Sequence, residues 1–344
     1  MKSSISAFFI LTFALLPGNG RAQTNPPLVA ATNAVSYAPA VLPGKGLAQH
    51  PFLLTGEADS RNQEQTLFVV RDGKVAWTYA VPLKTADGES ELGDATMLSN
   101  GNIVFCRKLG ASEVTPGKKV IWNMEAPKGT EIHSIQPIGL DRVLVTVNGH
   151  PPKLLLINTK TGATEKELTL PAARTNGSPH LQFRRVHQTA TGTYLAAHLL
   201  DNKVSEYDAD GKEIWTYAVG GPWSATRLKN GNTLIAANRK ILEVNHDGNV
   251  VWDFSPTNAP DYRLFIFQEV SRLANGNTVV CSWCPGGIRS STNWPGSVQV
   301  LEISPEKKIV WALSQWKDPD LGPASSIQLL DEPGTPENPG DLQR

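Results

Sequence analysis

Residues 210–215 read Asp-Gly-Lys-Glu-Ile-Trp, which combines a tight-turn pair, a short strand-like run and a tryptophan. The same pattern of turn, two or three mostly apolar residues and tryptophan recurs at residues 72–77, 118–122, 247–252 and 307–311. A phrase that returns at a regular spacing indicates one supersecondary unit copied along the chain. The repeat therefore predicts the architecture of the protein, whereas it names no reaction.

A second repeated signal precedes the tryptophan phrase. Asn-Gly-Asn stands between apolar runs in residues 98–105, 228–235 and 273–280, and weaker copies occupy residues 138–145 and 189–196. Asn-Gly between apolar runs favours a tight β-hairpin, because both residues tolerate positive φ. Each unit is therefore predicted to have four strands: A before this turn, B after it, C in the next short apolar segment, and D with the tryptophan.

The spacing of the tryptophans predicts the number of units. Residues 164–168 replace the tryptophan phrase in one degenerate unit, so Trp77 and Trp311 are five intervals apart, each about 47 residues long, as in four-stranded propeller blades. Residues 51–331 hold six such units. We predict an all-β fold, a six-bladed β-propeller of four-stranded antiparallel blades. Seven blades would need another unit in residues 24–50, which carry neither repeated phrase.

The first unit lacks a strand A of its own. It begins at residues 52–55, which match strand B of the other units, while residues 326–330 are a spare strand near the other end of the propeller. Pairing these two segments would close the ring and remove an open sheet edge. We predict that the last strand closes the first blade.

Segments at both ends of the chain lie outside the predicted propeller. Lys2, the apolar run of residues 8–16 and the small residues before position 23 predict a signal peptide over residues 1–22. Residues 23–50 are a Pro/Ala-rich N-terminal segment, and residues 332–344 are predicted to be a flexible C-terminal tail. The protein is expected to be exported, periplasmic or secreted, without stable insertion in a membrane.

Charge and cysteine content exclude two classes of protein. The 32 basic and 32 acidic residues balance, so we expect no nucleic-acid partner. The three cysteines, Cys106, Cys281 and Cys284, are too few for a disulfide scaffold. Residues three apart in a strand point to opposite faces, so we favour buried free thiols, although a bend after Cys284 would allow a bond to Cys281.

The Gly-Lys-x-x-Trp phrase resembles the tryptophan-docking repeat of PQQ-like (quinoprotein-type) β-propellers, and the Asn-Gly-Asn-Thr phrase resembles repeats of arylsulfotransferase-like propellers. The resemblance covers nearly the whole chain after residue 22 and implies that each indole packs against a neighbouring blade. Quinoprotein dehydrogenases of this type have eight blades and a disulfide of adjacent cysteines at the cofactor. This chain has about six units and no adjacent cysteines, so we predict no cofactor and do not expect PQQ to bind.

Candidate functional residues gather in the loops that lead into strand A and in those that join strands B and C, which a propeller places on one face around its axis. The catalytic candidates are His133, His187 and Arg185. The ligand-binding candidates are Glu131, Trp223, Glu269, Arg263 and Trp294. Such a mixture suits a polar ligand, because arginine binds anionic groups with two donors and tryptophan offers a stacking face.

No metal site is predicted. Two or three histidines would have to converge, such as His133 and His187 with His150 or His198, and their spacing along the chain does not test this.

The leading hypothesis is an exported binding module for a small polar ligand, a glycan or a protein partner on the loop face. One alternative is an enzyme with a His/Arg site on that face, either a carbohydrate-active lyase or hydrolase or a sulfotransferase-like enzyme in which a histidine is the nucleophile. Another is a scaffold in an envelope assembly, for which a large apolar surface patch is expected. The sequence leaves open whether the protein is an enzyme.

Overall fold

The computed structural model describes residues 38–82, 91–171, 178–285 and 290–344. The predicted signal peptide and most of the Pro/Ala-rich segment lie outside these residues. The described residues belong to one compact unit, residues 34–344, built almost entirely of strands. Among the residues that the structure describes, no helix is long and apolar enough to cross a membrane.

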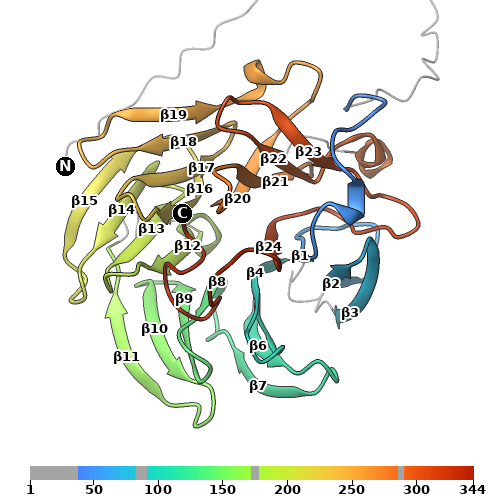
Figure 1. Ribbon diagram of the computed structural model, residues 1–344. Helices are drawn as coiled ribbons and strands as arrows, with labels where there is room; N and C mark the ends of the chain where they lie inside the picture. The colour runs from blue at the N-terminus through green and yellow to red at the C-terminus, as the bar shows by residue number, and fades with distance from the viewer. Residues whose placement is uncertain (1–37, 83–90, 172–177, 286–289) are drawn as a thin grey trace, which may run out of the picture. The chain divides into compact units, whose positions relative to one another are not determined.

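The unit is a six-bladed β-propeller, as predicted, and every blade is a four-stranded antiparallel sheet (Figure 1). In the order A to D, blade one is β24 (Ser326–Leu329), β1 (Phe52–Thr55), β2 (Glu64–Arg71) and β3 (Lys74–Pro82). Blade two is β4 (Leu92–Met97), β5 (Ile103–Arg107), β6 (Gly110–Val114) and β7 (Val120–Glu125). Blade three is β8 (Glu131–Pro137), β9 (Arg142–Asn148), β10 (Lys153–Asn158) and β11 (Thr164–Thr169).

Blade four is β12 (Phe183–Gln188), β13 (Tyr194–His198), β14 (Lys203–Tyr207) and β15 (Glu213–Ala218). Blade five is β16 (Pro222–Arg227), β17 (Thr233–Ala237), β18 (Lys240–Val244) and β19 (Val250–Phe254). Blade six is β20 (Ile266–Arg272), β21 (Thr278–Trp283), β22 (Val300–Ile303) and β23 (Ile309–Leu313). Short 3-10 helices are η1 (Gly46–Ala48), η3 (Pro179–Leu181), η4 (Pro256–Asn258) and η5 (Ser291–Gly296).

The ring closes through the predicted strand pair. β24 lies antiparallel to β1, with Leu329 opposite Phe52 and Ser326 opposite Thr55. The first blade therefore takes its strand A from the other end of the propeller, and β1 has a paired strand on both sides. Each strand A contacts the strands A of both neighbouring blades, so the six strands line the middle of the ring.

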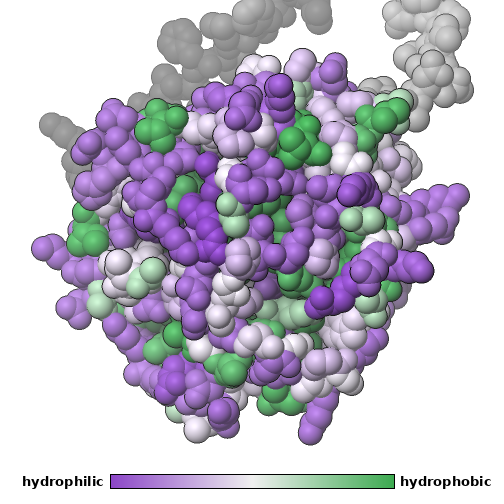
Figure 2. All heavy atoms as spheres, in the orientation of Figure 1, coloured by the Kyte–Doolittle hydropathy of each residue, from purple (hydrophilic) through white to green (hydrophobic). Residues whose placement is uncertain are grey.

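Apolar side chains fill the spaces between blades. The strands B of blades two, four and five, β5, β13 and β17, are buried at every position. Their consecutive apolar residues are covered from both faces, as the sequence predicts for packed blades. On the face shown in Figure 2, hydrophobic side chains are scattered among hydrophilic ones.

Tryptophans of strand D dock across the blade boundaries. The indole nitrogens of Trp77, Trp215 and Trp252 donate to main-chain carbonyls in the C–D turn of the next blade, over 2.8, 2.9 and 2.9 Å. At the closure, Trp311 donates instead to the carbonyl of Gly46 in η1 over 3.0 Å. The described part of the N-terminal segment therefore completes the boundary between blades six and one.

A charged contact accompanies this docking. At the boundary of blades five and six, Arg272 donates to Glu243 over 2.8 Å, and its guanidinium carbon lies 5.3 Å from the centre of the Trp252 ring. Asn232 of the Asn-Gly-Asn turn donates to the same carboxylate over 2.7 Å. The two repeated phrases of the sequence therefore meet in one contact between neighbouring blades.

Blade three keeps the boundary contact without a tryptophan. Lys166 lies opposite Leu156 on strand C, the place that Trp215 occupies opposite Glu206 in blade four. Its ammonium donates to the carbonyl of Ala209, in the C–D turn of blade four, over 2.5 Å. A lysine here takes over the hydrogen bond that the indole makes elsewhere, which explains how the degenerate unit fits the ring.

The last residues of the chain, for which a flexible tail is predicted, contact the propeller. Residues 332–344 run across the A–B turns, where Glu332 accepts from the amide of Ala274 over 2.8 Å and the amide of Gly139 donates to the carbonyl of Glu337 over 2.8 Å. The Glu337 side chain is buried and accepts from the amide of Ser99 over 3.1 Å. In Figure 1 the C-terminus lies near the middle of the ring.

The docking contacts imply unequal contributions to stability. Trp311 is fully buried, so we expect Trp311→Ala to lower the free energy of unfolding by about 3–5 kcal/mol. Trp77 is half-buried, and Trp77→Ala is expected to lower it by about 1–2 kcal/mol. Urea unfolding followed by circular dichroism measures both changes, and equal losses would contradict the closing role of Trp311.

Candidate functional site

β-Bulges shape the middle of the ring. In each of blades two to six the pairing of strands A and B shifts at the same point, so strand A carries one extra residue there. The residues at these shifts are Gly93 and Asp94, His133 and Ser134, Arg184 and Arg185, Trp223 and Ser224, and Gln268 and Glu269. A bulge re-aims side chains, which here gathers polar groups around the axis.

Two histidines share one carboxylate at the end of the ring where strands A begin, which we call the loop end. His133 Nε2 lies 2.8 Å from Glu131 Oε2, and His180 Nδ1 lies 2.9 Å from the same oxygen. The two imidazole rings meet edge to face, with centroids 5.1 Å apart. Because a carboxylate accepts, both of these ring nitrogens carry the proton.

Arg184 binds the other nitrogen of each ring. Its Nη1 donates to His133 Nδ1 over 3.2 Å and its Nη2 donates to His180 Nε2 over 3.1 Å. The guanidinium carbon lies 4.4 Å from the centre of the Trp223 ring, so the arginine is held between an indole face and two imidazoles. This arrangement requires both histidines to be neutral.

The surroundings separate the pKa values of this cluster. Burial lowers the pKa of His133 to about 3, so this imidazole stays neutral at physiological pH. Burial alone would raise the pKa of Glu131, but the hydrogen bonds from His133 and His180 outweigh it and hold that pKa well below its usual range. Burial raises the pKa of Glu91 to about 7, and the nearby carboxylate of Glu57 adds to the rise.

Two buried polar atoms of the cluster lack a partner. Among the described residues, neither Glu91 Oε2 nor Arg184 Nε makes a hydrogen bond, although both atoms are shielded from solvent. Glu91 Oε2 lies 3.8 Å from Arg184 Nη1 and 3.5 Å from His133 Nδ1, so this carboxylate borders the guanidinium whose Nε is unpaired. Buried polar atoms are nearly always hydrogen-bonded, so a polar group from outside the chain suits this place.

The cluster resembles a metal site but does not suit a metal. One ligand atom from each of Glu91, His133 and His180 lies within 4.8 Å of the others, close enough to share an ion. The histidine nitrogens that would bind the metal already accept hydrogen bonds from Arg184. A cation at this position would also be repelled by the charge of the guanidinium. The arrangement therefore favours an arginine-centred site.

A buried ion pair lies next along the axis. Arg185 Nε donates to Asp94 Oδ1 over 2.5 Å, and Arg185 Nη2 donates to the carbonyl of Ser325 over 2.8 Å. Ser134 Oγ donates to Asp94 Oδ2 over 2.8 Å. Burial would raise the pKa of Asp94, but the charge of Arg185 outweighs it and sets that pKa at about 2. The pair is therefore charged and hydrogen-bonded on both sides.

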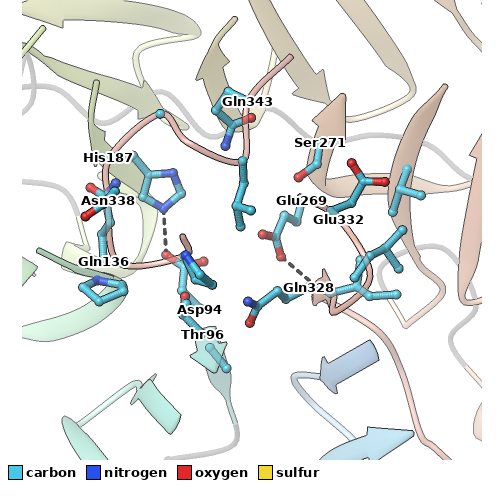
Figure 3. Close-up of a pocket in the computed structure, with 18 of the residues that line it drawn as sticks. Asp94, Thr96, Gln136, His187, Glu269, Ser271, Gln328, Glu332, Asn338 and Gln343 are labelled. Carbon is cyan, nitrogen blue, oxygen red and sulfur yellow. Dashed lines mark hydrogen bonds and ion pairs between the residues drawn. The ribbon is translucent and has the colours of Figure 1, made fainter. Parts of the chain in front are cut away.

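The structure does not bring the three catalytic candidates into one site. His133 belongs to the loop-end cluster, and Arg185 belongs to the ion pair. His187 lies beyond that pair, with Nε2 3.3 Å from Asp94 Oδ2, and lines a cavity at the other end of the ring (Figure 3). We call this other end, where the A–B turns lie, the turn end.

The predicted ligand-binding residues separate in the same way. Glu131 and Trp223 join the loop-end cluster, while Glu269 accepts from the amide of Ile327 over 2.9 Å and lines the turn-end cavity. Arg263 is exposed in the segment before β20. Trp294 is buried in a small core cluster with Cys284 and Trp316 and takes no part in either site.

Sequence reasoning missed the central member of the cluster. Arg184 was not singled out, because neighbouring residues of a regular strand point to opposite faces and Arg185 occupies the inward position. The bulge in β12 allows both side chains to be buried at the axis. The arginine doublet inside the segment that forms β12 is the one signal that pointed to it. As favoured from sequence, all three cysteines are buried free thiols.

Comparisons with known proteins agree with this architecture. A family profile, PQQ_2, described as the outer membrane protein assembly factor BamB, matches residues 182–290. Residues 182–290 carry PQQ-like repeats. This confirms the quinoprotein-type resemblance over that stretch, while the arylsulfotransferase-like resemblance stays an expectation. No curated protein matches the chain.

Several solved structures share the fold. A protein of unknown function from Bacteroides caccae is 25% identical with a TM-score of 0.68, and the match covers 81% of this chain and 98% of that one. A catalytically inactive variant of virginiamycin B lyase from Staphylococcus aureus, with quinupristin, is 13% identical with a TM-score of 0.52, over 79% and 87% of the two chains. A streptogramin B lyase is 12% identical with a TM-score of 0.51, over 82% and 87%. The two lyases show similarity of fold alone.

The environment of Glu91 gives a direct test of the cluster. The measurement is carboxyl ¹³C NMR of protein labelled at its glutamates, in which the signal of Glu91 is assigned by its absence from the Glu91→Gln variant. We expect this signal to titrate with a midpoint at a pH of about 7. The signal that disappears in Glu131→Gln should stay that of an ionised carboxylate down to pH 4. A midpoint below pH 5 for Glu91 would contradict the described packing.

The same shift predicts how stability depends on pH. The folded pKa of Glu91 lies above its ordinary value of 4.5, so the folded state binds more protons than the unfolded state between these values. The free energy of unfolding of the wild type should therefore fall, relative to that of Glu91→Gln, as pH rises from 4.5 to 7.

Proposed function

We propose that this protein is an exported binding module that takes a small hydroxyl-bearing ligand, such as the end of a glycan, at the loop-end cluster. The observation that carries the proposal is the pair of unpaired buried atoms, Glu91 Oε2 and Arg184 Nε. A hydroxyl group accepts one hydrogen bond and donates another. One hydroxyl can therefore accept from Arg184 and donate to Glu91.

The surroundings of these atoms support a ligand that enters from solution. His180 has 30% of its side chain exposed and Lys108 has 19%, whereas His133 and Trp223 are buried behind them. Lys108, whose ammonium lies 3.5 Å from Glu131, places a positive charge at the rim of the site. The buried groups hold Arg184 in place, which lowers the ordering cost of binding. The contacts are made by the chain alone, so we propose binding without a cofactor.

Export is the second part of the proposal. It is supported by the order of a lysine, an apolar run and small residues in positions 1–22, and by the similarity of residues 182–290 to an outer membrane assembly factor. We expect the full chain, expressed in a bacterium with an outer membrane, to appear in the periplasm or medium with Gln23 as its first residue. N-terminal sequencing checks this, and a cytoplasmic protein that keeps Met1 would contradict it.

A second candidate is an acid–base enzyme at the same cluster, such as a carbohydrate-active lyase or hydrolase. It is favoured by Glu91, whose pKa of about 7 lets it hold or release a proton at neutral pH beside the neutral His133. Glu131, with its lowered pKa, would stay ionised and orient both histidines. Groups whose pKa values are pushed apart in this way suit acid and base roles.

Binding is tested with a glycan array followed by calorimetry on the glycans retained. We expect Glu91→Gln and Arg184→Lys each to weaken the affinity at least tenfold, about 1.4 kcal/mol, since each removes one of the two proposed hydrogen bonds. Product analysis after long incubation with the same glycans separates the two candidates. Turnover that is lost in Glu91→Gln supports the enzyme, and binding without turnover supports the module.

Matched substitutions on the surface control for folding and charge. Glu167→Gln in β11 and Arg71→Lys at the end of β2 alter exposed side chains on outer strands and should leave the affinity unchanged. The proposal fails if no glycan binds the wild type, or if the surface variants weaken binding as much as those of the cluster.

A further inference from the structure

A glutamate of strand C and a tryptophan of strand D hold an arginine at two blade boundaries. Arg272 fills this place between blades five and six. Between blades four and five, Arg227 Nη2 lies 2.5 Å from Glu206 Oε2, and the guanidinium carbon lies 5.1 Å from the centre of the Trp215 ring. Both arginines are the last residue of a strand A. A permanent positive charge is therefore part of the docking contact at these two boundaries.

The boundary between blades six and one keeps the glutamate and the tryptophan but replaces the arginine. Glu302 lies opposite Trp311, while the last residue of β24 is Leu329, which carries no charge. His50, just before β1, takes the place of the arginine. Its Nε2 lies 3.1 Å from Glu302 Oε2, and its ring meets the Trp311 ring edge to face with centroids 5.3 Å apart. The boundary that closes the ring therefore holds an imidazole where its neighbours hold a guanidinium.

A second carboxylate faces the other nitrogen of this imidazole. His50 Nδ1 lies 2.9 Å from Asp331 Oδ2, in the segment that follows β24. The Glu302 side chain is 2% exposed and that of His50 is 12% exposed, whereas 41% of the Asp331 side chain is exposed. Among the described residues, these two carboxylates are the charged groups that contact the ring. The imidazole is therefore held between a buried acid and an exposed one.

Only the doubly protonated form of His50 can donate to both acids. A carboxylate accepts hydrogen bonds, so each ring nitrogen must carry a proton to bind its partner. A neutral imidazole has one N–H and would turn a lone pair toward either Glu302 or Asp331. It would also leave the buried carboxylate of Glu302 without a cation beside it, which is unfavourable. Loss of one proton therefore removes a hydrogen bond and a charge from this boundary.

The surroundings favour the protonated form. Burial would lower the pKa of His50, but the hydrogen bonds and charges of Glu302 and Asp331 outweigh it and raise this pKa above its ordinary value of 6.5. The folded state therefore binds the proton more tightly than the unfolded state does. The stability that the contact adds is fully present below pH 6.5, and it is lost as the pH rises through the folded pKa of His50.

The buried acid stays charged over this range. Burial would raise the pKa of Glu302, but the hydrogen bonds from His50 and Asn277 outweigh it and lower this pKa below its ordinary value. The charge of Glu302 therefore does not change where His50 titrates, and the imidazole is the group that switches.

The contact lies where the two ends of the propeller meet. His50 is the last residue of the N-terminal segment, and the amide of Leu330 donates to the carbonyl of Pro51 over 2.8 Å. Asp331 comes directly before residues 332–344, which cross the A–B turns. An arginine would hold these parts of the chain at any physiological pH, whereas a histidine holds them firmly only when it is protonated.

We propose that His50 makes the closure of the ring dependent on pH. The protonated imidazole ties the residues before β1 and those after β24 to blade six. When the proton is lost, one of the two carboxylates loses its donor, and the boundary between blades six and one opens more easily. The boundaries that hold Arg227 and Arg272 do not share this dependence.

Protonation of His50 is measured by ¹⁵N NMR of the histidine rings in the full chain, with its signal assigned by its absence from His50→Gln. We expect a midpoint above pH 6.5, with both ring nitrogens protonated below it. Asp331→Asn removes the charge of the exposed acid and should lower this midpoint without unfolding the protein. A wild-type midpoint at or below 6.5, or one that Asp331→Asn leaves unchanged, overturns the proposal.

The effect on closure is measured by urea unfolding and by hydrogen exchange of the Leu330 amide between pH 6 and pH 9. We expect the free energy of unfolding of the wild type to fall with rising pH relative to that of His50→Gln. The protection factor of the Leu330 amide should fall about threefold or more in the wild type. In His50→Arg, which restores the permanent charge, both quantities should lose this dependence.

A surface histidine provides the matched control. His246→Gln alters an exposed side chain in the C–D turn of blade five and should depend on pH as the wild type does. The proposal is overturned if the wild type and His50→Gln depend on pH alike, or if His50→Arg keeps the wild-type dependence. The comparison with His50→Gln decides even if His50→Arg fails to fold.

Discussion

The contact between an indole of strand D and the next blade is the interaction on which the structure depends. Each blade alone has two apolar faces that water would wet, and only a neighbour on each side can cover them. The indole sets the distance between blades by packing and the orientation by one hydrogen bond to a turn carbonyl. Repeated around an axis, this contact leads to a closed ring once the two ends share a sheet.

Closure then allows polar chemistry at the axis. The Arg185–Asp94 pair is buried, and burying charges is costly unless their hydrogen bonds are complete. Ser134 and the carbonyl of Ser325 complete them, from blades three and one. Only a rigid ring keeps such partners within hydrogen-bonding distance. The ion pair in turn separates the loop-end cluster from the turn-end cavity.

The loop-end cluster and the turn-end cavity both reach solvent. At the loop end His180 keeps 30% of its side chain exposed and contacts Arg184. At the turn end residues 332–344 cross the A–B turns, and His187 keeps 26% of its side chain exposed. The fold therefore presents polar side chains to solvent at both ends of the axis.

Much of the fold could be predicted because its signals are local. An Asn-Gly turn favours a hairpin wherever it occurs, and the tryptophan spacing counts blades without knowledge of contacts. The contact of residues 38–50 with the propeller could not be predicted in this way. Gly46, which accepts the hydrogen bond from Trp311, belongs to no repeated phrase. The contacts of residues 332–344 escaped prediction for the same reason, since their polar, Pro/Gly-rich composition gives no hint that Glu337 is buried.

By itself, the sequence determined six four-stranded blades, the closing strand and the structural role of the tryptophans, because turn chemistry and strand period act over a few residues. Tertiary structure alone decided which polar residues meet. Glu91, His133 and Arg184 come from three blades, and β-bulges turn their strands toward the axis. Their contacts depend on the angle between blades and on one extra residue in each strand, which no pattern along the chain encodes.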